Sequence, residues 1–259
     1  MKTTKFATRK PNLESLEIRS MMAGNVNVYM NSGDLMIVGD NASNHVAVRG
    51  NTNGTVTVYG EFTGGAPTSI NGRIGGSATF RITDDLAVYL YGGHDQIDLG
   101  NGNGVTAKVA DEVYVDAGSG NDWVMLRQVQ TGRHVNINTG TGQDKTYIGA
   151  SLIGDDLSVY DPTSVNQGDL DNVAINGSTI KDEVRVNTRG GNDRVEITVS
   201  KVDDVYVNLG AGNDYFAFSQ STVRSGFSID GQSGSDTFFA PIYGGKRYFG
   251  RNFERITNT

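Results

Sequence analysis

The sequence predicts an all-β fold, a parallel β-helix (solenoid) of about nine coils with roughly 22 residues per coil. Three observations lead to this prediction. An acidic glycine turn recurs along the chain, a pair of apolar residues at alternate positions precedes each turn, and a second such pair follows it. A period of two places these side chains on one face of a strand, and that face is buried only when units stack in parallel.

The turns are aligned on the aspartate that closes each of them, as in DAGSGNDWV (116–124). The aligned residues are Asp95, Asp122, Asp144, Asp171, Asp193, Asp214 and Asp236. The gaps between them are 27, 22, 27, 22, 21 and 22 residues. A period in this range is typical of a repeat architecture.

The strands are predicted on both sides of each turn. Before the turns stand Leu86/Val88, Val113/Val115, Val135/Ile137, Leu157/Val159, Val184/Val186, Val205/Val207 and Phe227/Ile229. After them stand Ile97/Leu99, Val124/Leu126, Thr146/Ile148, Val173/Ile175, Val195/Ile197, Phe216/Phe218 and Phe238/Ala240. A third apolar position four residues before the first pair predicts a short corner strand in most coils, with Val202 one residue out of step and Thr131 polar.

The first ninety residues follow the pattern less regularly. The first plausible strand lies at Val26–Val28, and residues 33–48 keep the coil pattern with Asn44 in the place of the aspartate. The 51 residues from Asn44 to Asp95 leave room for two coils, with an insertion at 60–77, and a smaller insertion is expected at 161–170. No linker rich in proline or serine is present, so we expect residues 1–24 to be a tail and residues 25–259 to form one β-helix domain.

Composition limits the function classes. The net charge of −7 over 259 residues makes nucleic acid an improbable partner, because phosphate backbones are repelled. There is no cysteine, which excludes disulfides and thiolate metal sites. No apolar stretch is long enough to predict a transmembrane segment.

The turns have two explanations that the residues leave open. Glycine tolerates positive φ, so the turns have a purely structural explanation. Stacked carboxylates repel one another, however, and a calcium ion that takes carboxylate and carbonyl oxygens offsets that charge. In the second explanation the metal ligands are Asp95, Asp122, Asp144, Asp193, Asp214 and Asp236.

Five of the turns resemble the nonapeptide of RTX (haemolysin-type) calcium-binding repeats, G-G-x-G-x-D-x-U-x. They are AGSGNDWVM (117–125), TGTGQDKTY (139–147), TRGGNDRVE (188–196), LGAGNDYFA (209–217) and GQSGSDTFF (231–239). The first glycine of the motif is usually replaced, and one turn per 22 residues matches where the family has one every nine. The resemblance implies a β-helix whose turns bind calcium, here between adjacent coils.

The segment LESLEIRSMMAGNV (13–26) resembles the N-terminal segment of many exported planctomycete proteins, L-E-x-L-E-x-R-x-[ML]-[ML]-A-G. The resemblance implies a secreted or cell-surface protein with a processing point near Ala23–Gly24. The tail lacks the long apolar core of a standard secretory signal.

A second acidic stripe precedes the first strand of many coils. It consists of Asp84–Asp85, Asp111–Glu112, Asp155–Asp156, Asp182–Glu183 and Asp203–Asp204. We interpret it as a solvated corner, with a weak cation groove as the alternative.

The main functional prediction is an exported, non-catalytic repeat protein that binds calcium and has a structural or adhesive role at the cell surface, with polysaccharide or other surface proteins as candidate partners. The alternative is a carbohydrate-active β-helix that binds or cleaves a polysaccharide. Its candidate binding residues point outward after the turns and are Trp123, Lys145, Tyr147, Arg194 and Tyr215. The three histidines fall in different registers, and no common catalytic motif occurs.

Overall fold

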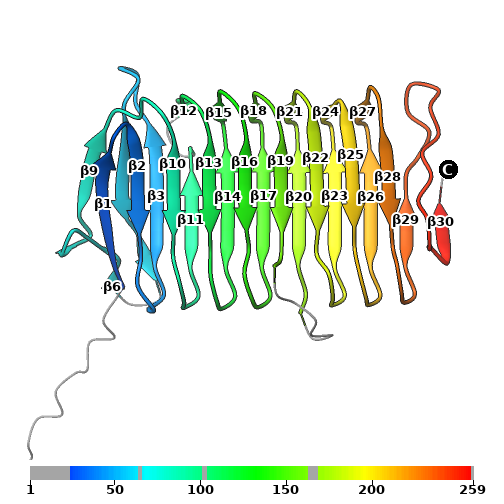
Figure 1. Cartoon of the computed structure of the whole chain (residues 1–259), viewed down its shortest axis with the longest axis horizontal. Coiled ribbons are helices and arrows are strands. Elements are labelled where there is room, and N and C mark those ends of the chain that lie inside the picture. The colour runs from blue at the N-terminus through cyan, green and yellow to red at the C-terminus, as the bar shows by residue number, and fades with distance from the viewer. Residues whose placement is uncertain (1–23, 64–65, 101–103, 163–168, 258–259) are drawn as a thin grey trace, which may run out of the picture.

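A computed structural model describes residues 24–63, 66–100, 104–162 and 169–257. Within these residues the protein is all-β, and its strands form three long sheets that run side by side along the long axis of the molecule (Figure 1). Nearly all neighbouring strands are parallel, which is consistent with the predicted β-helix or solenoid. The predicted tail lies outside the described residues except for Gly24.

The strands before the glycine turns form sheet 1. In spatial order it contains β8 (Arg73–Ile74), β7 (Ser69–Ile70), β1 (Asn25–Asn31), β2 (Asp34–Val38), β10 (Leu86–Tyr89), β13 (Val113–Asp116), β16 (Val135–Asn138), β19 (Leu157–Tyr160), β22 (Glu183–Asn187), β25 (Asp204–Asn208) and β28 (Phe227–Asp230). The glycine turns lie along the lower edge of the molecule in Figure 1.

The strands after the turns form sheet 2. In spatial order it contains β9 (Ser77–Phe80), β4 (Val56–Gly60), β3 (His45–Gly50), β11 (Gln96–Leu99), β14 (Trp123–Arg127), β17 (Lys145–Gly149), β20 (Asn172–Asn176), β23 (Arg194–Thr198), β26 (Tyr215–Ser219), β29 (Thr237–Phe239) and β30 (Arg255–Thr257). A separate pair consists of β5 (Phe62–Thr63) and β6 (Ala66–Pro67).

The predicted corner strands form sheet 3 at the opposite edge of the molecule (Figure 1). It contains β12 (Ala107–Val109), β15 (Val129–Thr131), β18 (Leu152–Ile153), β21 (Thr179–Ile180), β24 (Lys201–Val202) and β27 (Thr222–Val223). Thr131 pairs with Val109, and Val202 pairs with Val223 although its spacing to the following strand differs by one residue. Both exceptions to the apolar pattern therefore keep the register.

The apolar register continues through the coils, as predicted. Valines from different coils lie in one core cluster, and each is at most 3% exposed: Val113, Val115, Val124, Val184, Val186, Val205 and Val207. Thr146, the polar exception, pairs with Val124 and is buried as well. At the carboxyl end the core is closed by aromatic rings that contact one another, among them Phe216, Phe218, Phe227, Phe238 and Tyr248.

The region between Asn44 and Asp95 differs from the prediction of an additional coil. β3 pairs directly with β11, so the structure has no coil between them, and the predicted coil number includes one that does not exist. Instead, β4 and β9 extend sheet 2 with antiparallel pairing. The cause is the turn at residues 51–55, where Asn51 and Thr55 close a hydrogen bond of 2.8 Å and Gly54 has a φ of +78°. An Asn-Gly pair of this kind turns the chain back on the preceding strand.

Candidate functional site

The glycine turns place their backbone in conformations that only glycine adopts readily. Gly120 has a φ of +132° and Gly212 a φ of +148°. A Cβ atom on Gly120 would lie 1.5 Å from the carbonyl oxygen of Gly93 in the neighbouring coil. The glycines are therefore required by close stacking of the turns, and this requirement holds without any ligand.

The aspartates that close the turns point inward and form a continuous ladder. We call Asp95, Asp122, Asp144, Asp171, Asp193, Asp214 and Asp236 the aspartate ladder. In each, Oδ1 accepts the backbone N–H of the equivalent residue one coil earlier, over distances of 2.7–3.0 Å. Asn44 begins the ladder, and Glu254 accepts the N–H of Asp236 at 2.6 Å at its end.

The second oxygen of most ladder carboxyl groups is buried and lacks a partner among the described residues. This holds for Oδ2 of Asp95, Asp122, Asp144, Asp193, Asp214 and Asp236, the six residues that the sequence analysis assigns to calcium. Burial disfavours the charged form, and it is the main cause of the shifted pKa values. The pKa is raised to about 8 in Asp95, Asp144 and Asp171, to about 7 in Asp122 and Asp214, and to about 6 in Asp193.

The backbone oxygens that an RTX-type turn would offer to calcium are engaged in hydrogen bonds between coils. The carbonyl of Gly118 accepts the N–H of Thr141 at 2.9 Å, and the carbonyl of Ser119 accepts the N–H of Gly93 at 2.9 Å. Calcium takes six to eight oxygens. A calcium ion at these turns would depend on the unpartnered Oδ2 atoms, and any carbonyl ligand would have to share its oxygen with a hydrogen bond.

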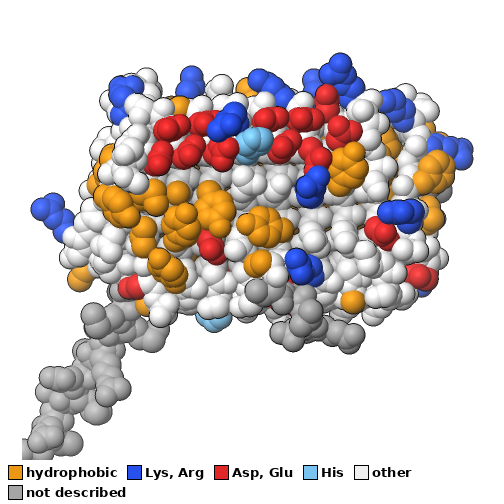
Figure 2. Space-filling model, in the orientation of Figure 1, with side chains coloured by type: hydrophobic (Ala, Val, Ile, Leu, Met, Phe, Trp, Pro, Cys, Tyr) orange, Lys and Arg blue, Asp and Glu red, His pale blue; other side chains and the backbone are white. Residues whose placement is uncertain are grey.

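The second acidic stripe lies on the surface, along the edge next to sheet 3. Figure 2 shows it as a double row of acidic side chains, interrupted by basic ones. We call it the acidic corner, and it consists of Asp34, Asp84, Asp85, Asp111, Glu112, Asp155, Asp156, Asp182, Glu183, Asp203 and Asp204. Asp34 belongs to it because β2 pairs with β10, a contact that the sequence analysis did not consider.

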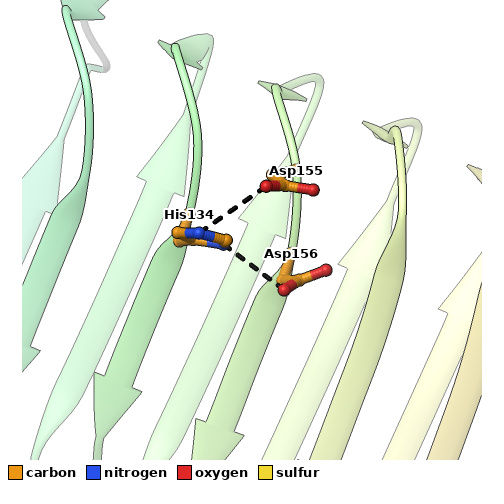
Figure 3. Close-up of side chains that lie close together, drawn as sticks. All are labelled: His134, Asp155 and Asp156. Atoms are coloured by element: carbon orange, nitrogen blue, oxygen red, sulfur yellow. Dashed lines mark ion pairs between the residues drawn. The ribbon is translucent and has the colours of Figure 1, made fainter.

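The middle of the acidic corner contains an arginine and a histidine that contact the acids. Arg133 bonds to both carboxylate oxygens of Asp111, which holds the pKa of Asp111 below its usual range. His134 lies between two acids of the next coil, with Nε2 3.6 Å from Asp155 and Nδ1 3.4 Å from Asp156 (Figure 3). These contacts support the interpretation of this part of the corner as a solvated, internally paired surface.

One end of the acidic corner has no such compensation. Carboxylate oxygens of Asp34, Asp84 and Asp85 all lie within 4.8 Å of one another, and none of the ion pairs found in the described part of the chain includes them. Desolvation and repulsion from Asp85 and Asp34 raise the pKa of Asp84. Asp84 and Asp85 belong to the stripe that was identified from the sequence, whereas Asp34 was not included because the pairing of β2 with β10 was not foreseen.

A comparison of the chain with models of protein families, with curated protein sequences and with solved structures finds no match. The class of protein is therefore defined by the structure itself, an all-β repeat protein with long parallel sheets. The described part of the chain contains no helix that is long and apolar enough to cross a membrane.

Proposed function

We propose that the chain is an exported, non-catalytic repeat protein, a closed solenoid with a structural or adhesive role at the cell surface, and that calcium stabilises it through the aspartate ladder. The observation that carries the calcium proposal is the row of buried Oδ2 atoms without a partner, one in nearly every turn. A buried oxygen of this kind requires an explanation, such as a proton, an ordered water or a bound ion. The resemblance of the turns to RTX repeats supports the ion.

The carboxyl groups of the ladder change from protonated to ionised as the pH rises. Below the raised pKa values the carboxyl groups are protonated and the stacked turns carry no charge. Above them the carboxylates repel one another, and a cation that binds only the folded state then stabilises it by mass action. The stabilisation by calcium is therefore expected to be larger at pH 8 than at pH 5.

The test is a thermal melt of the full chain at pH 8 in millimolar calcium and in chelator. Calcium is expected to raise the melting temperature of the wild type. Asp193→Asn combined with Asp214→Asn should remove most of that gain, because consecutive turns lose their charged ligands. The matched control is Asp34→Asn with Asp84→Asn, which removes two acids from the corner and leaves the ladder intact.

The outcomes separate the candidate sites. Loss of the gain in the ladder variant alone supports the proposal. Loss in the corner variant alone moves the ion to Asp34, Asp84 and Asp85 and contradicts the assignment to the turns. Identical melting of the wild type in calcium and in chelator contradicts calcium binding altogether.

Export is tested separately, in the cells that produce the chain. Protease added to intact cells should remove the protein if it is at the surface, and the culture medium should contain it if it is secreted. Full protection inside intact cells would contradict the export that the segment at 13–26 implies.

A further inference from the structure

A groove runs along the outer side of the glycine turns, where they enter sheet 2. Its volume is about 670 Å³, and residues of five successive coils, from His94 to Arg194, line it. At the coil spacing of sheets, five coils span about 19 Å. Phe62 and Leu170, both exposed, belong to its lining and lie in or beside the two predicted insertions.

Two rows of side chains flank the aspartate ladder in the groove. The residues directly after the aspartates are paired in register on neighbouring strands, in the order Gln96, Trp123, Lys145, Asn172 and Arg194. The residues directly before the aspartates are His94, Asn121, Gln143 and Asn192. Parallel register therefore repeats a polar side chain at nearly every coil, at a spacing similar to that of the rings in an extended glycan.

Trp123 provides an apolar surface within this polar groove. It is the chain's only tryptophan, and 40% of its side chain is exposed although it lies in the middle of sheet 2. An aromatic ring that combines an apolar face with a polar N–H suits ligands that have both kinds of surface. The face of a pyranose ring, with its C–H groups, is such a surface.

The amide side chains present hydrogen-bond donors. Oδ1 of Asn121 accepts the N–H of Gln143 at 3.0 Å, and Oδ1 of Asn192 accepts the N–H of Asn213 at 2.7 Å. The backbone thereby fixes both side chains, and none of the hydrogen bonds found among the described residues uses their NH₂ groups. Fixed donors in a row are suited to the hydroxyl and carboxylate oxygens of a sugar chain.

Lys145 gives the groove its charge preference. It is exposed next to Trp123 in the register, and it takes part in none of the ion pairs found among the described residues. Arg194, at the far end, pairs with Glu196 and lies over the Tyr215 ring at 4.2 Å, which fixes its position. Lys145 supplies a local positive charge that can pair with an anionic group, in a groove that Asp95 and Asp122 also line.

We propose that this groove binds a linear glycan that carries carboxylate groups, with Trp123 stacked on a sugar ring and Lys145 paired with a carboxylate. The carboxyl groups on the floor of the groove are held in the ladder by backbone N–H groups, and we propose binding alone, without a catalytic step. The inference deepens the adhesive part of the proposed function and does not depend on calcium.

The test is a titration of the full chain, in chelator at pH 7, with hexasaccharides of galacturonic, glucuronic and mannuronic acid. The fluorescence of Trp123 and calorimetry report binding independently. The fully methyl-esterified galacturonic hexamer and a neutral glucose hexamer are the matched uncharged probes. We expect at least one uronic acid hexamer to bind about tenfold more tightly than the uncharged probes.

The variants locate the site. Trp123→Ala and Lys145→Gln should each weaken binding about tenfold or more, whereas Lys201→Gln in sheet 3 and Tyr206→Ala on sheet 1 should not change it. Melting curves confirm that all four variants fold. Absence of binding by all three uronic acid hexamers, equal binding of the uncharged probes, or unchanged binding by Trp123→Ala would each overturn the inference. Because calcium is absent, none of these results bears on the calcium proposal.

Discussion

Two ladders of buried side chains run along the coils, at different bends of the same chain. In the aspartate ladder a carboxyl oxygen accepts the N–H of the preceding coil. In the second, which we call the serine ladder, Oγ of Ser151, Ser178, Ser200 and Ser221 accepts the equivalent N–H at 2.9–3.2 Å. Each serine hydroxyl also donates to a carbonyl two residues earlier, at 2.8–3.1 Å.

The difference lies in what remains unpartnered. The serine hydroxyl uses its proton and its lone pair, so the bend is satisfied and neutral. The aspartate accepts the N–H with Oδ1. In most ladder residues its other oxygen, Oδ2, is buried and has no hydrogen-bond partner among the described residues. A bend that needed only an acceptor would be served by serine, so the ladder of acids makes the stability of one edge of the molecule sensitive to protons and cations.

The largest expected effect is a pH dependence of stability that comes mainly from the aspartate ladder. The folded pKa values are raised to about 6–8, while the unfolded value is about 3.9. The folded state then binds more protons than the unfolded state. The contribution of the ladder to the free energy of unfolding is therefore fully present below pH 4, and it is lost as the pH rises through the folded pKa values. One pKa unit corresponds to about 1.4 kcal/mol, so several ladder residues together should cost several kcal/mol between pH 5 and pH 8.

The measurement is denaturant unfolding at both pH values in chelator. Ser200→Ala serves as the control and should keep the full pH dependence of the wild type. A free energy of unfolding that is constant or rises towards pH 8 would show that the ladder is ionised at little cost.

Asp193 allows the acceptor and the charge to be separated. Asp193→Ala leaves the N–H of Asp171 without an acceptor and should destabilise the fold by about 1–3 kcal/mol at both pH values. Asp193→Asn keeps an acceptor oxygen for the N–H of Asp171 and removes the charge. It should therefore be less destabilising than alanine at pH 5 and match or exceed the wild type at pH 8. Equal losses for both variants in denaturant unfolding would contradict this separation.

The serine ladder should respond to the loss of its acceptor without any pH dependence. Ser200→Ala leaves the N–H of Ser178 unsatisfied and should cost about 1–2 kcal/mol. The loss is expected to be the same at pH 5 and pH 8, because no group at that bend titrates in this range. A loss that changes with pH would mean that the two ladders are coupled through the core.

The smallest effect concerns the backbone next to the serine ladder. Val199 is a β-branched residue with a φ of +54°, and its side chain is 54% exposed. A left-handed conformation costs an ordinary residue about 1–2 kcal/mol, so Val199→Gly should relieve strain and lose little packing. We expect Val199→Gly to raise the free energy of unfolding by up to about 1 kcal/mol, measured by thermal unfolding. Val202→Gly, in the buried corner strand, is the opposing control and should clearly lower it. A destabilised Val199→Gly would show that the side chain contributes packing that its exposure conceals.

The coil register was predictable because apolar alternation depends on residues that are close in the sequence. Val113 and Val115, for example, stand at alternate positions and therefore lie on the same, buried face of their strand. The orientation of Asp193 was not predictable in this way, because its partner is a backbone N–H 22 residues earlier. Within a turn, moreover, no alternation of apolar residues indicates which side chains point inward. From the sequence we expected something to offset the stacked charges, but protonation and the neighbouring amide were not considered.

Other differences come from contacts between distant segments. The antiparallel strands β4 and β9 had a local signal in Asn53–Gly54, which the search for coils passed over. The cluster of Asp34, Asp84 and Asp85 required knowing that β2 lies beside β10. In the groove, Trp123 and Lys145 were recognised as outward residues, whereas His94, Asn121 and Asn192 were hidden within the turns.

The antiparallel strands at the amino-terminal end also change the sheet edge that the molecule presents to a second copy. Bare parallel coils at both ends would form a template for head-to-tail polymerisation, because each open edge offers unpaired backbone groups to the next copy. Here sheet 1 ends on the two-residue strand β8, and sheet 2 ends on β9, which runs antiparallel to its neighbour. A second copy stacked head to tail would therefore meet antiparallel rather than parallel strands at this end.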